Sequence, residues 1–152
     1  MNVKPNTQKA APADLHSQVV RAKDMPWQKT RFPGCEMKTL LFDPTSGLAT
    51  LMMRMEPGAV LPDHEHVLIE QTFVLEGSLV DKEGPDAGIE VGPGEFVWRP
   101  AGSRHSAWSP KGGTFIGMFP DSQQILRGRR QGDRRQRQGM GPGLGAFITG
   151  MS

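Results

Sequence analysis

Residues 58–77 read GAVLPDHEHVLIEQTFVLEG, and this stretch contains His64, His66 and Glu70. Successive side chains of an extended strand point to opposite faces. If residues 58–77 are extended, the two imidazoles and the carboxylate share parity and converge on one face. Nitrogen and carboxylate donors that meet in this way are the ligands that many divalent transition-metal ions accept.

A second stretch, residues 94–105, reads GEFVWRPAGSRH and supplies a third imidazole, His105. Pro100 and Gly102 predict a tight turn, so His105 lies on a separate strand. A lone histidine on a strand is more often an ordinary side chain with its hydrogen bonds satisfied, and His-x-His alone is weak evidence. The combination with Glu70 and His105 favours a metal site.

Three neutral nitrogens and one oxygen suit a borderline divalent ion such as Fe(II), Mn(II), Ni(II), Cu(II) or Zn(II). Four protein ligands around an octahedral ion leave two positions open. These positions accommodate a bidentate substrate, or a substrate together with dioxygen. We therefore expect one divalent transition metal as cofactor. Fe(II) is favoured, with Zn(II), Mn(II) and Ni(II) as alternatives.

Turn residues divide the chain into strand-sized segments. Of the 152 positions, 19 are glycine and 13 are proline, turns recur about every 8–12 residues, and no window shows sustained helical periodicity. This pattern predicts an all-β, small single domain, a sandwich or barrel of antiparallel strands. The expected strands are residues 36–42, 48–55, 71–75, 78–81, 95–99 and 114–119, with a hairpin-like turn at Glu76-Gly77 and a short edge strand at 17–20.

The composition excludes several classes of protein. Cys35 is the single cysteine, which rules out an intramolecular disulfide framework and a site built from several thiolates. No apolar run approaches the length of a membrane-spanning helix, and the N-terminus lacks the apolar segment of a secretory signal. We therefore expect a cytoplasmic protein that does not associate with membranes. His16 lies in the polar N-terminal segment, and we regard it as unrelated to the metal site.

The charge is unevenly distributed along the chain. Residues 1–120 hold 12 Lys and Arg against 14 Asp and Glu, whereas residues 121–152 hold six Arg and two Asp. The body is slightly acidic and gives no reason to expect a nucleic-acid partner. We divide the chain into a flexible arm at 1–24, a barrel at 25–120 and an Arg/Gly-rich tail at 121–152.

The basic tail has three interpretations. It is an arm for an acidic partner or nucleic acid, a disordered tail, or the product of a reading-frame shift near Phe119-Pro120. We favour the third, because Arg, Gly and Gln at this density are what GC-rich coding DNA yields out of frame. Sequencing the gene across these two codons tests the interpretation.

Both motifs match the paired motifs of the cupin superfamily. The first, G-x5-H-x-H-x3-E-x6-G, is met from Gly58 to Gly77, and the second, G-x5-P-x-G-x2-H-x3-N, is met from Gly94 to His105. Its last position is Ser109 instead of asparagine, a residue that is not a metal ligand in the family. A looser likeness extends over about residues 26–119. It resembles the cupin domains of ChrR-type anti-sigma factors and acetylacetone-cleaving dioxygenases.

The resemblance implies a small jelly-roll barrel with the metal inside, often dimeric. It implies His64, His66, Glu70 and His105 as the metal ligands. We expect a homodimer that acts on a small molecule.

The favoured activity is a dioxygenase that cleaves a small dicarbonyl or hydroxyketone, bound to the metal through two oxygens as an enolate. Glu70 is the candidate catalytic base. One alternative is a sugar or keto-acid isomerase, and another is a ChrR-like metal- or ligand-binding domain without catalysis. A ChrR-type anti-sigma factor would need a helical module with a His/Cys site, which the roughly 25 polar residues before the barrel do not provide. Fold alone does not decide between them.

Strand alternation and residue type indicate structural roles for several further side chains. The pairs Phe96 with Trp98 and Phe115 with Phe119 are each expected to pack in the core or to form apolar walls around the metal, with core packing preferred for most of them. Met52, Met53 and Met55 are expected as core residues, Cys35 as a small buried hydrophobe, and Glu65 as a solvent-facing side chain.

Overall fold

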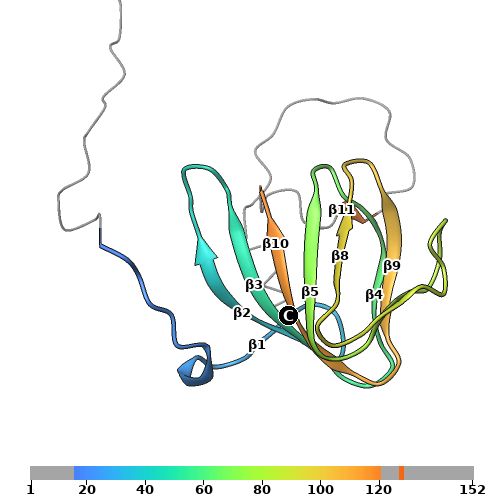
Figure 1. Ribbon diagram of the computed structural model, residues 1–152, viewed down its shortest axis with the longest axis horizontal. Coiled ribbons are helices and arrows are strands. Elements are labelled where there is room, and N and C mark those ends of the chain that lie inside the picture. The colour runs from blue at the N-terminus through green and yellow to red at the C-terminus, as the bar shows by residue number, and fades with distance from the viewer. Residues whose placement is uncertain (1–15, 121–126, 129–152) are drawn as a thin grey trace, which may run out of the picture.

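The computed structural model describes residues 16–120 and 127–128, which form an all-β jelly-roll barrel of two antiparallel sheets. In Figure 1 the two sheets face each other, with β2 and β3 on one side and β9 on the other. One sheet has the strand order β1-β2-β3-β10-β5-β8 and the other β11-β4-β9-β6-β7. The strands are β1 (Gln28–Lys29), β2 (Cys35–Phe42), β3 (Ala49–Met55), β4 (Ala59–Glu65), β5 (Glu70–Gly77), β6 (Leu79–Asp81), β7 (Glu90–Val91), β8 (Phe96–Arg99), β9 (Arg104–Ser109), β10 (Gly113–Phe119) and β11 (Arg127–Gly128).

The core lies between the sheets and draws on both. Its main cluster takes Met55, Val74 and Phe115 from the first sheet and Leu61 and Ala107 from the second. The burial of alternate residues along the strands follows from the two-residue period of a sheet that has one buried face. Cys35 and Met55 are buried in this cluster, which confirms the expectation for both.

Most of the expected strands are present, but the chain crosses between sheets where simpler connections were predicted. Residues 58–70 do not form one extended strand: β4 ends at Glu65, and β5 begins at Glu70 in the other sheet. Likewise, Glu76-Gly77 does not close a hairpin, because β5 and β6 belong to different sheets. Residues 17–20 form no strand, and a short 3-10 helix, η2, follows at Ala22–Asp24.

Gly77 permits the second crossing. Its φ is +75°, and a Cβ built there would lie 1.8 Å from the carbonyl oxygen of Gly112. Ser78, the next residue, donates its backbone N–H to that oxygen at 3.1 Å. The backbone of the loop before β10 therefore occupies the space that any side chain at position 77 would need.

The aromatic pairs have opposite outcomes. Phe115 and Phe119 are buried, as expected, whereas Phe96 and Trp98 are 48% and 57% exposed. The expectation for Phe96 and Trp98 is wrong because β8 is an edge strand whose other face, with Val97 and Arg99, points inward. Parity groups the residues of a strand correctly but does not say which group faces the core.

The predicted arm and tail lie mostly outside the described residues. Of the arm, residues 16–24 are described, and of the tail only the two-residue strand β11, whose backbone pairs with β4. The division of the chain at residues 24 and 120 and the frame-shift interpretation stay predictions. In the part of the chain that is described, no helix is long and apolar enough to cross a membrane.

Candidate metal centre

His64 and His105 are brought together by strand pairing. β4 and β9 are antiparallel neighbours, and their register places His64 directly opposite His105. The centroids of the two rings are 4.4 Å apart. The second sequence motif thus contributes its histidine from the strand beside the first, as expected.

His66 is positioned by the turn that precedes His105. Its backbone N–H donates to the carbonyl of Ser103 at 2.9 Å, and its carbonyl accepts from the N–H of Gly102 at 2.6 Å. Gly102 has a φ of +83°, a conformation that favours glycine. These two backbone bonds join the motifs and explain why one of them carries Pro-x-Gly before its histidine.

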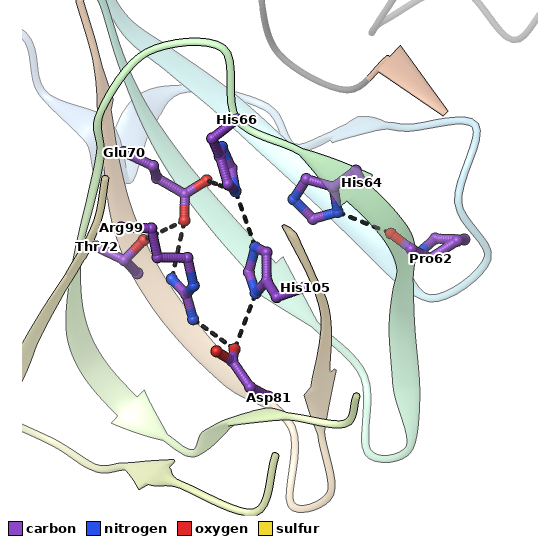
Figure 2. Close-up of polar contacts among 8 residues, drawn as sticks. All are labelled: Pro62, His64, His66, Glu70, Thr72, Asp81, Arg99 and His105. Carbon is purple, nitrogen blue, oxygen red and sulfur yellow. Dashed lines mark hydrogen bonds and ion pairs between the residues drawn. The ribbon is translucent and has the colours of Figure 1, made fainter. Parts of the chain in front are cut away.

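Four donor atoms converge on one point, as Figure 2 shows for the labelled side chains. One ligand atom from each of His64, His66, Glu70 and His105 lies within 4.8 Å of all the others. His66 Nε2 is 2.9 Å from His105 Nε2 and 3.3 Å from Glu70 Oε2. Ligands about 2.1 Å from a shared ion lie roughly 3–4 Å from one another. The cluster could therefore hold a metal ion with small adjustments.

The four residues are also buried, at 3%, 3%, 8% and 4% exposure for His64, His66, Glu70 and His105. Burial, followed by the proximity of His105, lowers the pKa of both His64 and His66 to about 4. Both rings are therefore neutral near pH 7, which is the form that binds metals.

The tautomers are set by the hydrogen bonds on the far side of two rings. His64 Nδ1 lies 2.7 Å from the carbonyl oxygen of Pro62, and His105 Nδ1 lies 2.9 Å from Asp81 Oδ1. Both oxygens accept hydrogen bonds, so Nδ1 carries the proton in each ring and Nε2 keeps its lone pair. The donor set therefore fits a metal ion chemically as well as in distance.

A buried arginine links the two carboxylates beside the cluster. Arg99 donates from one terminal nitrogen to Glu70 Oε1 at 3.0 Å and from the other to Asp81 Oδ1 at 2.6 Å. Thr72 Oγ1 donates to the same Glu70 oxygen at 3.2 Å. Burial raises the pKa of Asp81, but the hydrogen bonds from His105 and Arg99 outweigh it, and the pKa is lowered overall.

The sequence interpretation missed Asp81, Arg99 and Thr72. Strand register places Arg99 directly opposite Glu70 on β5 and β8. It also pairs Asp81 with Ala107, two residues from His105 on the same face of β9. Thr72 shares the parity of Glu70 and was the one signal in the sequence that could have been used. The other two depend on a pairing that the sequence alone does not give.

A small cavity opens onto the donors. Its volume is about 40 Å³. His64, Glu70 and His105 form its polar side, and the rest of the lining is almost entirely apolar. The apolar lining consists of Met53, Met55, Leu61, Leu79, Ala107, Phe115 and Phe119. Of the expected apolar walls, Phe115 and Phe119 are thus present.

Three other side chains singled out in the sequence lie outside the donor cluster. His16 is exposed and does not belong to the cluster. Glu65 points away from the cluster and pairs with Arg104 at the surface, as expected for a solvent-facing side chain. Ser109, the position that departs from the motif, is fully buried and donates its hydroxyl to the carbonyl of Ser78 at 2.6 Å. It therefore ties β9 to the start of β6 and does not disturb the donors.

Two antiparallel sheets that enclose three histidines and a glutamate, contributed by two separate motifs, define a cupin barrel. Within that class the chain belongs to the ChrR cupin-like domain family, whose model matches residues 15–121. The resemblance seen in the sequence is thereby confirmed.

Three known proteins illustrate the range of relatives. Over 82 residues the chain is 32% identical to oxalate decarboxylase OxdC of Bacillus subtilis (strain 168), a match covering 51% of this chain and 21% of that enzyme. The chain thus spans about a fifth of the length of this curated relative. A protein of Methylibium petroleiphilum PM1, proposed to be an acetylacetone dioxygenase, superposes with a TM-score of 0.63 and 20% identity over 70% of this chain and 78% of that one. The polyketide cyclase RemF of Streptomyces resistomycificus has a TM-score of 0.56 and 28% identity over 68% and 78% of the two chains.

Proposed function

We propose that this protein is a metal-dependent dioxygenase that cleaves a small dicarbonyl or hydroxyketone. Its metal is one divalent ion, Fe(II) in the first place, with His64, His66, Glu70 and His105 as ligands. The observation that carries the proposal is the convergence of four buried donors beside a small apolar cavity. When bound, the metal supplies Lewis acidity and one-electron chemistry with oxygen.

The names of the relatives support a substrate that chelates through oxygen. Oxalate, acetylacetone and a polyketide each offer two oxygens placed to bind one metal ion. The names of the three proteins indicate different activities, and the compounds that they name share this chelating arrangement of oxygens. We assign the same class of ligand to this chain.

The charge of the site favours an anionic form of such a substrate. Asp81, Arg99 and Glu70 are the charged groups around the histidines. A divalent ion added to them leaves a net charge of about +1, which a singly charged enolate neutralises. Neutralisation matters here because an unpaired charge in a buried site is costly.

The protein's part in the reaction is to bind the substrate, exclude water and accept a proton. The apolar side of the cavity, including Phe115 and Phe119, packs against small alkyl or acyl groups and limits their size. Glu70 is the proposed catalytic residue. Its Oε2 has no contact with Arg99, so this oxygen either binds the ion or accepts the proton that the substrate loses on forming an enolate. In the overall reaction one carbon–carbon bond breaks, dioxygen is reduced, and both its atoms enter the two carbonyl products.

The test combines metal analysis with oxygen uptake. Protein produced without added zinc is analysed by mass spectrometry for bound metals and is then assayed with a panel of β-diketones and hydroxyacetophenones. Oxygen uptake that requires Fe(II) and is lost in His105→Ala supports the proposal. Tight zinc binding with no turnover across the panel contradicts it, and isomerisation without oxygen uptake would replace it by the isomerase alternative.

A second candidate is a metal- or ligand-binding domain without catalysis. The match of residues 15–121 to the ChrR cupin-like family favours it, since the family takes its name from ChrR. The same donor cluster then holds a metal in a binding role only. The zinc-bound, inactive outcome of the test above selects this candidate.

Three further expectations, on location, oligomeric state and domain boundaries, belong to the same proposal. We propose that the chain works in the cytoplasm, that it forms a homodimer, and that residues 25–120 suffice for the barrel. Exposed aromatic side chains on the outer face of β5 and β8, namely Phe73, Phe96 and Trp98, are consistent with burial in a dimer. Sedimentation measurements on the full chain test the dimer, and expression of residues 25–120 tests the boundaries.

A further inference from the structure

Arg99 is an unusual side chain in this barrel because its charged end is buried next to the candidate metal ligands. Only 6% of the residue is exposed. Its two terminal nitrogens bridge Glu70 and Asp81, as the dashed lines in Figure 2 show. A guanidinium has a planar, forked arrangement of donors, which suits two carboxylates held at a fixed spacing.

The first consequence concerns Glu70. Arg99 and Thr72 both donate to Oε1, at 3.0 Å and 3.2 Å. Oε2, which lies 3.3 Å from His66 Nε2, has no contact with Arg99. Arg99 and Thr72 therefore hold the Glu70 carboxylate with Oε2 toward the imidazoles. Free rotation of the carboxylate would exchange Oε1 and Oε2.

The second consequence concerns His105, which Arg99 reaches through Asp81. Asp81 Oδ1 accepts from Arg99 and from His105 Nδ1, at 2.6 Å and 2.9 Å. A carboxylate on Nδ1 fixes both the tautomer and the direction of Nε2. Two of the four candidate ligands are thus oriented by one guanidinium.

His105 needs this orientation because it borders two hollow regions. It lines the apolar cavity of about 40 Å³ and also a separate outer cleft of about 480 Å³, which Asp81 and Arg99 line as well. An imidazole with open space on two sides is held less firmly by packing alone than one in a dense core. Its hydrogen bond to Asp81 at Nδ1 therefore helps to fix where Nε2 points, together with the contact between Nε2 and His66 Nε2 at 2.9 Å.

As a charge alone, Arg99 would oppose metal binding, because a positive side chain near the ligands repels a cation. Orientation and charge thus predict opposite effects when Arg99 is neutralised. If its charge dominates, neutralisation tightens metal binding. If its geometry dominates, neutralisation weakens it.

We propose that Arg99 is a positioning residue for the metal centre, which orients Glu70 directly and His105 through Asp81. The proposal rests on the metal site in the proposed function but not on catalysis. It assigns the pair Arg99–Asp81 a role in metal affinity.

The experiment measures the dissociation constant for Co(II) by competition with a chelator, together with the visible spectrum of the Co(II) form. Three variants are compared: Arg99→Gln removes the positive charge, Arg99→Lys keeps the charge but loses the forked geometry, and Asp81→Asn removes the negative charge that holds Arg99 and His105 together. Each is expected to weaken Co(II) binding roughly 10- to 100-fold and to change the spectrum. Asp81→Asn with Arg99→Gln combined should lose less than the two single losses multiplied, because the residues act as one unit.

Arg104→Gln is the matched control. Arg104 also bridges two carboxylates, Asp63 and Glu65, but its side chain is 40% exposed and lies outside the donor cluster. This variant should bind Co(II) as the natural chain does. If the loss of any arginine that bridges two carboxylates weakens Co(II) binding, Arg104→Gln will show the same weakening. That result would overturn the proposal.

The remaining outcomes are also decisive. Unchanged or tighter Co(II) binding in Arg99→Gln means that charge dominates and contradicts the proposal. If Arg99→Gln does not fold, Arg99→Lys and Asp81→Asn decide the question. The proposal is contradicted if both of these variants bind Co(II) with the affinity and the visible spectrum of the natural chain. If the natural chain binds Co(II) and shows no turnover, the dioxygenase fails while this inference is still tested. If the natural chain binds no Co(II), both fail.

Discussion

His64 and His105 face each other across neighbouring antiparallel strands, with ring centroids 4.4 Å apart. The first comes from the motif at residues 58–77 and the second from the motif at residues 94–105. Each ring has its Nδ1 hydrogen bonded to an oxygen behind it, Pro62 O for one and Asp81 Oδ1 for the other. Strand register and hydrogen bonding together point the Nε2 atoms of both rings at one place.

Replacement of His105 by alanine should abolish tight metal binding. The substitution removes one of four donors and breaks the contact with Asp81. We expect the affinity for a divalent ion to fall by more than about 100-fold, because the substitution removes a proposed ligand and not merely a hydrogen-bonded neighbour of one. Equilibrium dialysis with metal analysis measures the loss. His16→Ala, at an exposed histidine outside the cluster, is the control and should bind metal normally.

The metal-free protein should lose stability as the pH falls from about 6.5 to about 4. The pKa values of His64 and His66 are lowered to about 4 in the folded chain, against about 6.5 when unfolded. Between these values the unfolded state binds more protons, so the free energy of unfolding rises with pH. Urea denaturation across pH 4.5–7.5 should show a change of a few kcal/mol. The slope should be smaller in His64→Gln, and an equal slope would contradict the assignment.

Cys35 should resist modification in the folded protein. Burial, aided by the nearby charge of Glu56, raises the pKa of its thiol to about 11. The thiolate is the reactive form, so little of it is present at pH 8. A thiol reagent should react slowly with native protein and rapidly, with one equivalent per chain, after denaturation. Rapid reaction before unfolding would show that this position opens far more readily than its burial implies.

Gly77→Ala should destabilise the fold much more than Gly58→Ala. Both glycines have positive φ values, +75° and +84°. Only at position 77 does an added Cβ collide with backbone, at 1.8 Å from Gly112 O, whereas nothing lies within 4 Å at position 58. Gly58→Ala should cost about 1 kcal/mol from backbone conformation alone. Gly77→Ala should cost several times more. Equal losses in the free energy of unfolding, measured by urea denaturation, would show that the backbone around Gly77 shifts at little cost.

The sequence predicted that the four side chains of the donor cluster come together, because their chemistry and spacing are local signals. It predicted this partly for the wrong reason: His64, His66 and Glu70 share parity, but the chain turns between the sheets after Glu65. What brings His66 into place is its backbone bonding to Ser103 and Gly102. The residue spacing within the motif is compatible with such a turn but does not indicate it.

The errors have a common physical origin in long-range pairing. Arg99 was overlooked because its partner Glu70 lies on another strand, and their register is invisible in the sequence. Phe96 and Trp98 were assigned inward because alternation does not identify the buried face of an edge strand. Strand boundaries such as Ala49–Met55 were more predictable, since turn residues and alternation are local signals.

Diffraction at a metal absorption edge, from crystals grown with a divalent transition metal, tests the central claim most directly. The account predicts one strong anomalous peak per barrel, within bonding distance of a nitrogen from each of His64, His66 and His105 and of one oxygen of Glu70. A metal bound elsewhere on the chain, with these four side chains left uncoordinated at saturating metal, would contradict it.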